Sequence, residues 1–196
     1  MATIKQKDNS NTWLKAALRR KFLPKDARVL DLFCGTGEMY NRVYKDKTRS
    51  YHGVDKAKTH DQTLCTLIDN TVYVSRHDMD DYNVFDLDDY GCPWGLLYLV
   101  LRKRGPGRIT VFLTDGLPLH LKLTGKVTKM QSGIERLPKD MNIPGEFRFY
   151  VDMFGTMLLD LETRYGWKTE NATYARNENA TVYYWALSMN KGALAK

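Results

Sequence analysis

Two glycines and the acids around them are the residues of this 196-residue chain whose types and spacing suggest a ligand site. Gly35 and Gly37 allow a tight turn and a close approach of the backbone to a ligand. They follow the apolar run 29–33 and precede a helical pattern, so backbone N–H groups at a helix start would face the bound molecule. Asp31 interrupts the apolar run and Glu38 follows the loop. Acids at these places favour a ligand with an amino group or a positive centre.

The residues after the glycines disfavour the two commonest nucleotide-binding loops. A dinucleotide loop needs a third glycine, and Tyr40 places a bulky ring at that position. A phosphate-binding loop needs lysine and then serine or threonine after its second glycine, where this chain has Glu38 and Met39. NAD, FAD, ATP and GTP are therefore not the expected ligands.

The elements that must position these residues alternate as in a parallel sheet. Strands are expected at residues 28–33, 50–55, 71–77, 83–88 and 108–114, and helices at residues 13–22, 38–46, 63–68, 94–104 and 146–165. Strands and helices at this spacing predict βαβ units with right-handed crossovers. Residues 166–174 and 180–188 alternate like two strands, which predicts an antiparallel hairpin at the far edge of the sheet.

The composition, 43% hydrophobic and 27% charged, is typical of a globular protein. We expect a single domain over residues 1–196, with an N-terminal helical extension at 1–27 and a substrate-facing insertion at 115–145. No apolar run approaches the roughly 18 residues of a membrane span. The three cysteines, without a CxxC pair, indicate neither a disulfide framework nor a zinc site. The expectations are a cytoplasmic protein, no membrane partner and no metal.

The net charge of +7 is unevenly distributed, with basic groups around an acidic centre. This pattern is compatible with nucleic acid as a partner, and on charge alone it is equally compatible with a solvated basic face. The basic groups are Lys15, Arg19, Arg20, Lys21, Lys25 and Arg28; Arg102, Lys103, Arg104 and Arg108; and Lys122, Lys126 and Lys129.

The run Asp31-Leu32-Phe33-Cys34-Gly35-Thr36-Gly37 resembles the first motif of the class I S-adenosylmethionine-dependent methyltransferases. The resemblance implies an α/β, Rossmann-like methyltransferase fold. That fold has a seven-stranded, mostly parallel sheet with a C-terminal antiparallel hairpin. The resemblance also implies S-adenosylmethionine as the cofactor.

This resemblance assigns roles to acids at the carboxyl ends of the strands, where ligands of doubly wound sheets bind. Asp31 is expected to take the amino group of the methionine part, and Asp55 the two ribose hydroxyls. Asp78 is expected to accept from the adenine amine, with Met79 beside the ring. The whole expected cofactor-binding set is Asp31, Phe33, Cys34, Gly35, Gly37, Asp55, Lys56, Asp78 and Met79.

A second run, Asp86-Leu87-Asp88-Asp89-Tyr90-Gly91, resembles the catalytic loop of amino-methyltransferases. More narrowly, it resembles the Asp-Pro-Tyr-Gly loop of tRNA guanine-N2 methyltransferases. The resemblance implies that Asp88 accepts hydrogen bonds from an exocyclic amine and that Tyr90 stacks on the base. A carboxylate acceptor would localise the amine lone pair toward the methyl group. Asp89 stands where that family has proline, so the loop loses a rigid turn and gains a negative charge.

Three hypotheses remain open at this stage. The first is an S-adenosylmethionine-dependent methyltransferase acting on an amine of a nucleic acid, RNA or DNA, which is the expected partner. The second keeps the fold and cofactor but makes the acceptor a protein or a small molecule. The third is a catalytically inactive binding module. A homodimer or a partner protein is the other partner considered, and substrate selection would fall to the N-terminal helix and residues 115–144, or to a partner.

Overall fold

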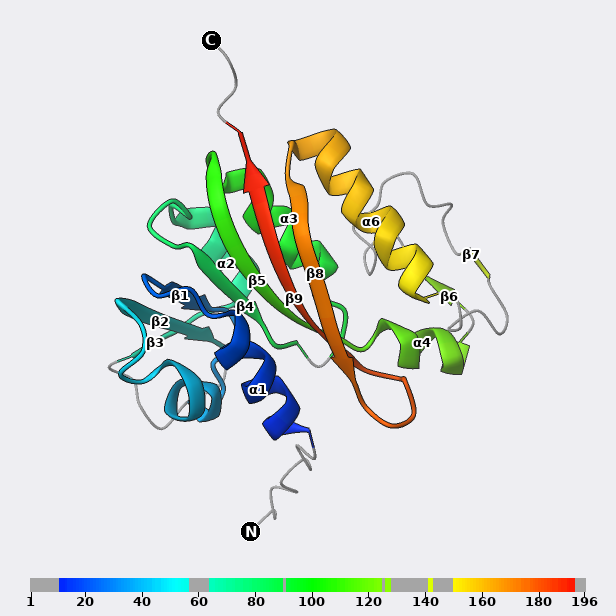
Figure 1. Cartoon of the computed structure of the whole chain (residues 1–196), viewed down its shortest axis with the longest axis horizontal. Coiled ribbons are helices and arrows are strands. Elements are labelled where there is room, and N and C mark those ends of the chain that lie inside the picture. Colours follow the sequence, from blue (N-terminus) through cyan, green and yellow to red (C-terminus); the bar gives the residue numbers. More distant parts are fainter. Residues whose placement is uncertain are drawn as a thin grey trace.

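The computed structural model describes residues 11–56, 64–89, 91–124, 126–127, 141–142 and 150–192 (Figure 1). The strands are β1 (Arg28–Asp31), β2 (Ser50–Asp55), β3 (Cys65–Leu67), β4 (Val84–Leu87), β5 (Gly107–Asp115), β6 (Lys126–Val127), β7 (Met141–Asn142), β8 (Lys168–Arg176) and β9 (Tyr183–Lys191). The helices are α1 (Thr12–Phe22), the π-helical turn η1 (Tyr40–Tyr44), α2 (Asn70–Arg76), α3 (Trp94–Lys103), α4 (Leu117–Thr124) and α6 (Tyr150–Tyr165).

One seven-stranded sheet, in the order β3-β2-β1-β4-β5-β9-β8, forms the centre of the molecule. The first five strands in this order pair in parallel, and β9 pairs antiparallel with both β5 and β8. The turn between β8 and β9 is closed by Asn177, whose side-chain oxygen accepts the backbone N–H of Thr181 at 2.8 Å and of Val182 at 3.1 Å. The predicted fold class is therefore confirmed, including the C-terminal hairpin.

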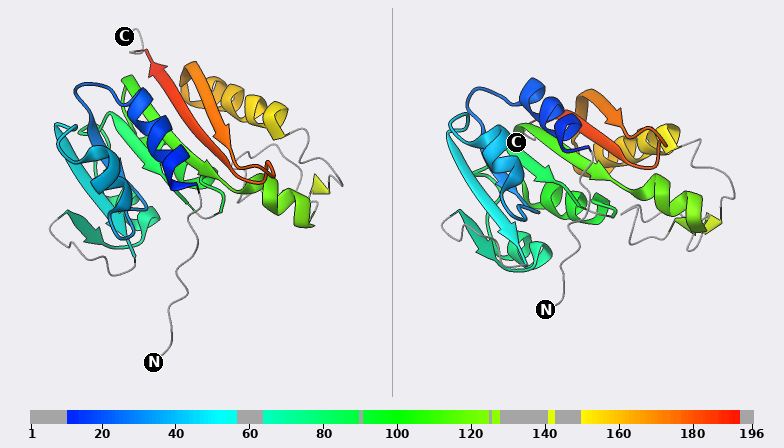
Figure 2. Two further views of the ribbon diagram at one scale, coloured as in Figure 1. Left: turned by 60° about the horizontal axis from the view of Figure 1, so that its bottom comes forward. Right: turned by 90° about the horizontal axis from the view of Figure 1, so that it is seen from below.

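Helices cover both faces of the sheet, as Figure 2 shows. On one face Val29 and Val84 pack in a cluster with residues of α1 and η1. On the other face their neighbours Leu30 and Phe85 pack with residues of α2, α3 and α6. Because side chains alternate along a strand, this two-sided burial explains the nearly continuous apolar runs of β1 and β4.

The third strand is the one sheet element that the sequence prediction misplaced. Residues 63–68 were expected to lie on a helix, but they include β3, and the expected strand 71–77 overlaps the helix α2. The cause is Asp69, whose carboxylate accepts the backbone N–H of Thr71 at 2.9 Å and of Val72 at 3.2 Å. This N-cap starts the helix in spite of the β-branched residues that follow it.

Of the predicted insertion at 115–145, the structure describes Asp115, Gly116, α4, β6 and β7, and the rest lies outside the described residues. The first four residues of the predicted helix 146–165 also lie outside them. Within the described part of the chain, none of the helices has the length and apolar character needed to cross a membrane.

Candidate active site at the carboxyl edge of the sheet

The glycine loop joins β1 to η1 in a tight turn. Gly35 and Gly37 have φ angles of +50° and +79°, in the left-handed region that favours glycine. The turn is closed by the Gly37 N–H, which donates to the Cys34 carbonyl at 2.8 Å. The Gly35 N–H donates to Asp55 Oδ2 at 3.0 Å, which fixes the loop against the end of β2. The loop and Asp55 therefore form one unit.

A hollow of about 410 Å³ lies beside this unit, within the size range of small-molecule sites. Its walls come from the ends of β1 and β2, the start of α2, the loop after β4, and α3. They combine carboxylates with an apolar surface. The lining residues are Phe33, Asp55, Lys56, Asp69, Asn70, Thr71, Asp89, Cys92, Gly95, Leu96 and Leu99.

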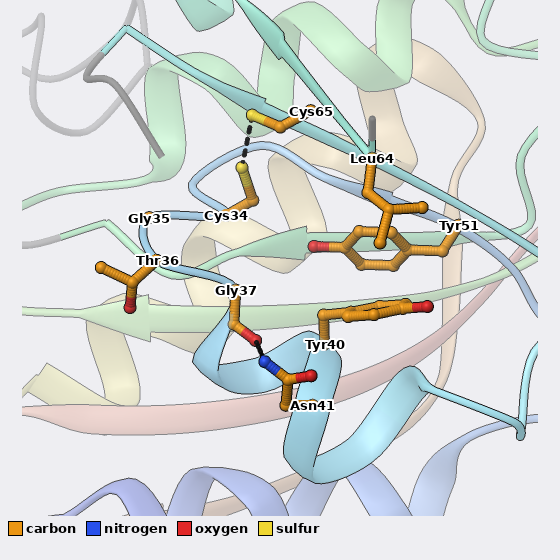
Figure 3. Close-up of a pocket in the computed structure, with 9 residues that line it drawn as sticks. All are labelled: Cys34, Gly35, Thr36, Gly37, Tyr40, Asn41, Tyr51, Leu64 and Cys65. Atoms are coloured by element: carbon orange, nitrogen blue, oxygen red, sulfur yellow. Dashed lines mark hydrogen bonds between the residues drawn. The ribbon is translucent and has the colours of Figure 1, made fainter. Parts of the chain in front are cut away.

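A second, smaller cavity of about 50 Å³ lies where the loop faces η1, β2 and β3 (Figure 3). Its walls include Cys34, Gly35 and Gly37 and the rings of Tyr40 and Tyr51, whose centroids are 4.7 Å apart. Of the nine expected cofactor residues, three thus line the larger hollow (Phe33, Asp55 and Lys56) and three the smaller cavity (Cys34, Gly35 and Gly37).

The assignment of Asp78 and Met79 to the adenine site is wrong. Both follow α2 and precede β4, so they lie at the opposite, amino edge of the parallel strands. Asp78 Oδ1 accepts the Asp80 N–H at 2.9 Å, and Met79 is fully buried in the core. The error follows from the misplaced third strand. Residues 71–77 were expected to be a strand with Asp78 at its carboxyl end, but they overlap the helix α2, which ends at the opposite edge of the sheet.

Asp69 and Asn70 occupy the position that Asp78 was expected to fill. They lie between the end of β3 and the first turn of α2, and both line the larger hollow. Asn70 Oδ1 is buried and has no hydrogen-bond partner among the described residues, which leaves it able to accept from a ligand amine. The sequence did carry a signal for this site, because aspartate, here Asp69, is a preferred residue at a helix N-cap.

Asp31 lies outside both hollows and is buried on the face covered by α1 and η1. Its carboxylate accepts the Tyr51 hydroxyl at 2.9 Å and the Phe33 N–H at 3.1 Å. Burial, and then the nearby charge of Asp86, raise the pKa of Asp31 well above its ordinary value. In the described structure its role is to hold the start of the glycine loop.

Asp88, the expected catalytic carboxylate, is held by the N-terminal helix. Lys15 Nζ lies 2.6 Å from Asp88 Oδ1, and Arg19 Nη2 lies 3.7 Å from Oδ2. Burial opposes the charge, but Arg19 and Lys15 outweigh it and lower the pKa of Asp88. The next residue, Asp89, lines the larger hollow instead. Tyr90, the expected stacking ring, lies outside the described residues.

Lys15 and Arg19 were expected to belong to an exposed basic group, and both are buried. Inside the protein, Arg19 is paired with Asp86 of β4, and Lys15 is paired with Asp88, which follows β4. In the third basic group, Lys122 is exposed on α4, whereas Lys129 and the side chain of Lys126 lie outside the description.

Asp115 ties the end of β5 to its surroundings. Its carboxylate accepts the Trp94 indole N–H and the Tyr150 hydroxyl, both at 2.6 Å, and the Leu117 N–H at 2.9 Å. The adjacent Gly116 N–H donates to the Gly91 carbonyl at 2.7 Å. The end of β5 is therefore bonded to the loop that was expected to be catalytic.

Asp115 gives this structure a pH dependence that can be measured. Burial raises its pKa from 3.8 to about 6, so the folded protein keeps this proton where the unfolded chain loses it. The resulting stabilisation is complete below about pH 4 and is lost as the pH rises through about 6. The free energy of unfolding should be measured from pH 4 to 7 for the unaltered protein and for Asp115→Asn. Over this range the unaltered protein should lose about 3 kcal/mol of stability relative to Asp115→Asn. Parallel stability profiles would contradict this assignment.

Comparison with known proteins identifies solved structures with a similar fold. No family model and no curated protein matches the sequence. Among solved structures, yhhF of Escherichia coli, which bears the name of a methyltransferase, is 12% identical over 95% of this chain and 90% of its own, with a TM-score of 0.54. A Streptococcus thermophilus protein named as a hemolysin is 11% identical over 98% of this chain and 70% of its own, with a TM-score of 0.58.

A third structure, TYW2 of M. jannaschii in complex with AdoMet, is 10% identical over 91% of this chain and 77% of its own, with a TM-score of 0.54. At such low identity these likenesses concern the fold alone. The chain therefore has the fold of these proteins. One of them bears the name of a methyltransferase, and another was solved with S-adenosylmethionine.

Proposed function

We propose that this protein binds S-adenosylmethionine in the hollow of about 410 Å³ and transfers its methyl group to an exocyclic amine of a nucleic-acid base. The observation that carries the proposal is that three kinds of group share this hollow. They are a residue of the glycine loop (Phe33), the acid that ends β2 (Asp55), and the polar pair that follows β3 (Asp69 and Asn70).

The lining residues match the parts of the cofactor. Asp55 would accept the ribose hydroxyls, because a carboxylate can take two donors at once. Asn70 Oδ1, buried without a partner among the described residues, would accept from the adenine amine. Leu96 and Leu99 of α3 give an apolar wall for the adenine ring. The glycine loop, which lines this hollow through Phe33, would lie against the methionine part.

When bound, the cofactor supplies a methyl group on a positively charged sulfur. The protein's part is to place an acceptor amine in line with that methyl group and to hold its N–H bonds. The loop after β4 is the proposed place, with Asp88 as the hydrogen-bond acceptor and Tyr90 as the stacking ring. Because Lys15 is bonded to Asp88, an incoming amine would have to share this carboxylate with Lys15 or displace it.

The same ion pair favours a second candidate function, a binding module without catalysis. A carboxylate already bonded to one cation and close to another is a weaker acceptor for an amine. The departure from the family at Asp89 points the same way, because a rigid proline is absent from the loop.

Incubation with methyl-labelled cofactor and a cell extract, fractionated into nucleic acid, protein and small molecules, tests the proposal. Label is expected in the nucleic-acid fraction. Asp88→Asn should lower the initial rate at least tenfold, with the affinity for S-adenosylhomocysteine retained, because the residue acts on the acceptor. Label in protein or small molecules would make the acceptor class wrong. Cofactor binding without label in any fraction would support the binding module.

A further inference from the structure

Two thiols meet beside the glycine loop although they lie far apart in the sequence. Cys34 Sγ and Cys65 Sγ are 2.7 Å apart, and both cysteines are free thiols in the structure. Figure 3 shows the two sulfur atoms pointing toward each other across the smaller cavity, one from the loop and one from β3. Sulfur atoms in a disulfide are about 2.05 Å apart, so a movement of roughly 0.7 Å would join them.

The fold creates this contact through a glycine in the strand between them. Gly53 of β2 pairs with Asp31 of β1 on one side and with Cys65 of β3 on the other. A Cβ atom at Gly53 would lie 2.8 Å from Cys34 Cβ and 2.9 Å from its Sγ. Only a residue without a side chain leaves room there for the Cys34 side chain to reach across β2.

Cys34 also belongs to the turn that borders the proposed cofactor site, which the turn lines through Phe33. Its carbonyl accepts the Gly37 N–H at 2.8 Å, and the neighbouring Gly35 N–H is bonded to Asp55. A covalent bond from Cys34 to β3 would therefore draw the turn toward β3 and hold it there. The turn could then no longer adjust to an entering ligand.

We propose that Cys34 and Cys65 form a reversible disulfide under peroxide and that this bond lowers the affinity of the glycine loop for its cofactor. The part concerning affinity rests on the proposed function. The disulfide itself does not depend on it.

The oxidation balances with hydrogen peroxide as the oxidant. Cys65, the more exposed of the two, attacks one peroxide oxygen, the O–O bond breaks, and a sulfenic acid and one water form. The Cys34 sulfur then attacks the Cys65 sulfur and the S–O bond breaks. The hydroxyl leaves with the Cys34 proton as a second water. Two thiols are oxidised, one peroxide is reduced, and added dithiol reverses the reaction. Burial raises the pKa of the Cys34 thiol, in agreement with Cys65 reacting first.

The test uses the whole 196-residue chain, which is reduced, freed of reductant and then treated with hydrogen peroxide. Peptide mass spectrometry without reductant should find Cys34 linked to Cys65, in the unaltered protein and equally in Cys92→Ser. The link should be absent in Cys65→Ser and reduced in Gly53→Ala. Because the link closes a long loop, the oxidised form should melt about 5 °C or more above the reduced form, a difference that Cys65→Ser lacks.

Calorimetric titration with S-adenosylhomocysteine should then show an affinity at least tenfold lower in the oxidised protein, restored by dithiothreitol. Oxidation of Cys65 to sulfinic acid without a link to Cys34 would contradict the proposed disulfide. Complete formation of the disulfide with an unchanged affinity for S-adenosylhomocysteine would contradict the proposed effect of the disulfide on the cofactor site. If the reduced protein itself binds no S-adenosylhomocysteine, the proposed function fails, and the peptide link and melting shift still decide whether the disulfide exists.

Discussion

Replacing Arg19 with methionine is expected to lower the free energy of unfolding by about 3–5 kcal/mol. Arg19 Nη2 and Nε lie 2.6 and 2.7 Å from the two carboxylate oxygens of Asp86, and the two side chains are 1% and 0% exposed. Tyr44 donates its hydroxyl to the same carboxylate. Methionine would fill much of the volume but would leave Asp86 as a buried charge without its cation.

Urea unfolding followed by circular dichroism measures this effect, and an exposed pair provides the matched control. Arg108 and Glu170 are also ion-paired, at 3.1 Å, but their side chains are 72% and 34% exposed, so Arg108→Met should change stability by less than about 1 kcal/mol. The double variant Arg19→Met with Asp86→Leu should recover most of the loss, since no charge is then left buried alone. Equal effects of Arg19→Met and Arg108→Met would contradict this account.

Replacing Asp55 with alanine is expected to weaken S-adenosylhomocysteine binding at least about a hundredfold. Two charge-assisted hydrogen bonds to a ribose contribute roughly 1.5–3 kcal/mol each, and the variant loses both. It also removes the acceptor for the Gly35 N–H, so the loop loses its tie to β2. Isothermal titration calorimetry gives the two dissociation constants directly.

Variants of two other acids, Asp69 and Asp78, show whether the loss of binding is specific to the carboxyl edge of the sheet. Asp69→Ser keeps a residue that can cap α2 and removes the carboxylate from the hollow, so it should weaken binding by a smaller factor. Asp78→Ala, at the opposite edge, should leave the affinity unchanged. An Asp78→Ala variant as weak as Asp55→Ala would show that the cofactor lies elsewhere.

Local patterns in the sequence were sufficient to predict most of the fold. The strand before Gly35 and the acid that ends β2 could be predicted because each depends on residues close in the chain. The third strand could not, because residues 71–74 are β-branched or aromatic, as is typical of a strand, while the Asp69 cap and the packing of Tyr73 and Val74 make them helical. In this segment tertiary packing overrode β-propensity.

The surroundings of Asp88 could not be predicted, for a different reason. Lys15 is 73 residues away from Asp88 in the sequence, and only the docking of α1 onto the sheet brings them together. The charge count therefore placed Lys15 and Arg19 on a basic surface, whereas the fold buries both. The meeting of Cys34 and Cys65 is similar, since it depends on which strand lies between them.

Titration of the unaltered 196-residue chain with S-adenosylhomocysteine is the decisive measurement, because the site, the chemistry and the acceptor all presuppose the cofactor. We predict saturable binding with one molecule per chain. Heat no larger than that of dilution, at ligand concentrations up to about 1 mM, where binding free energies are only about 4 kcal/mol, would contradict it.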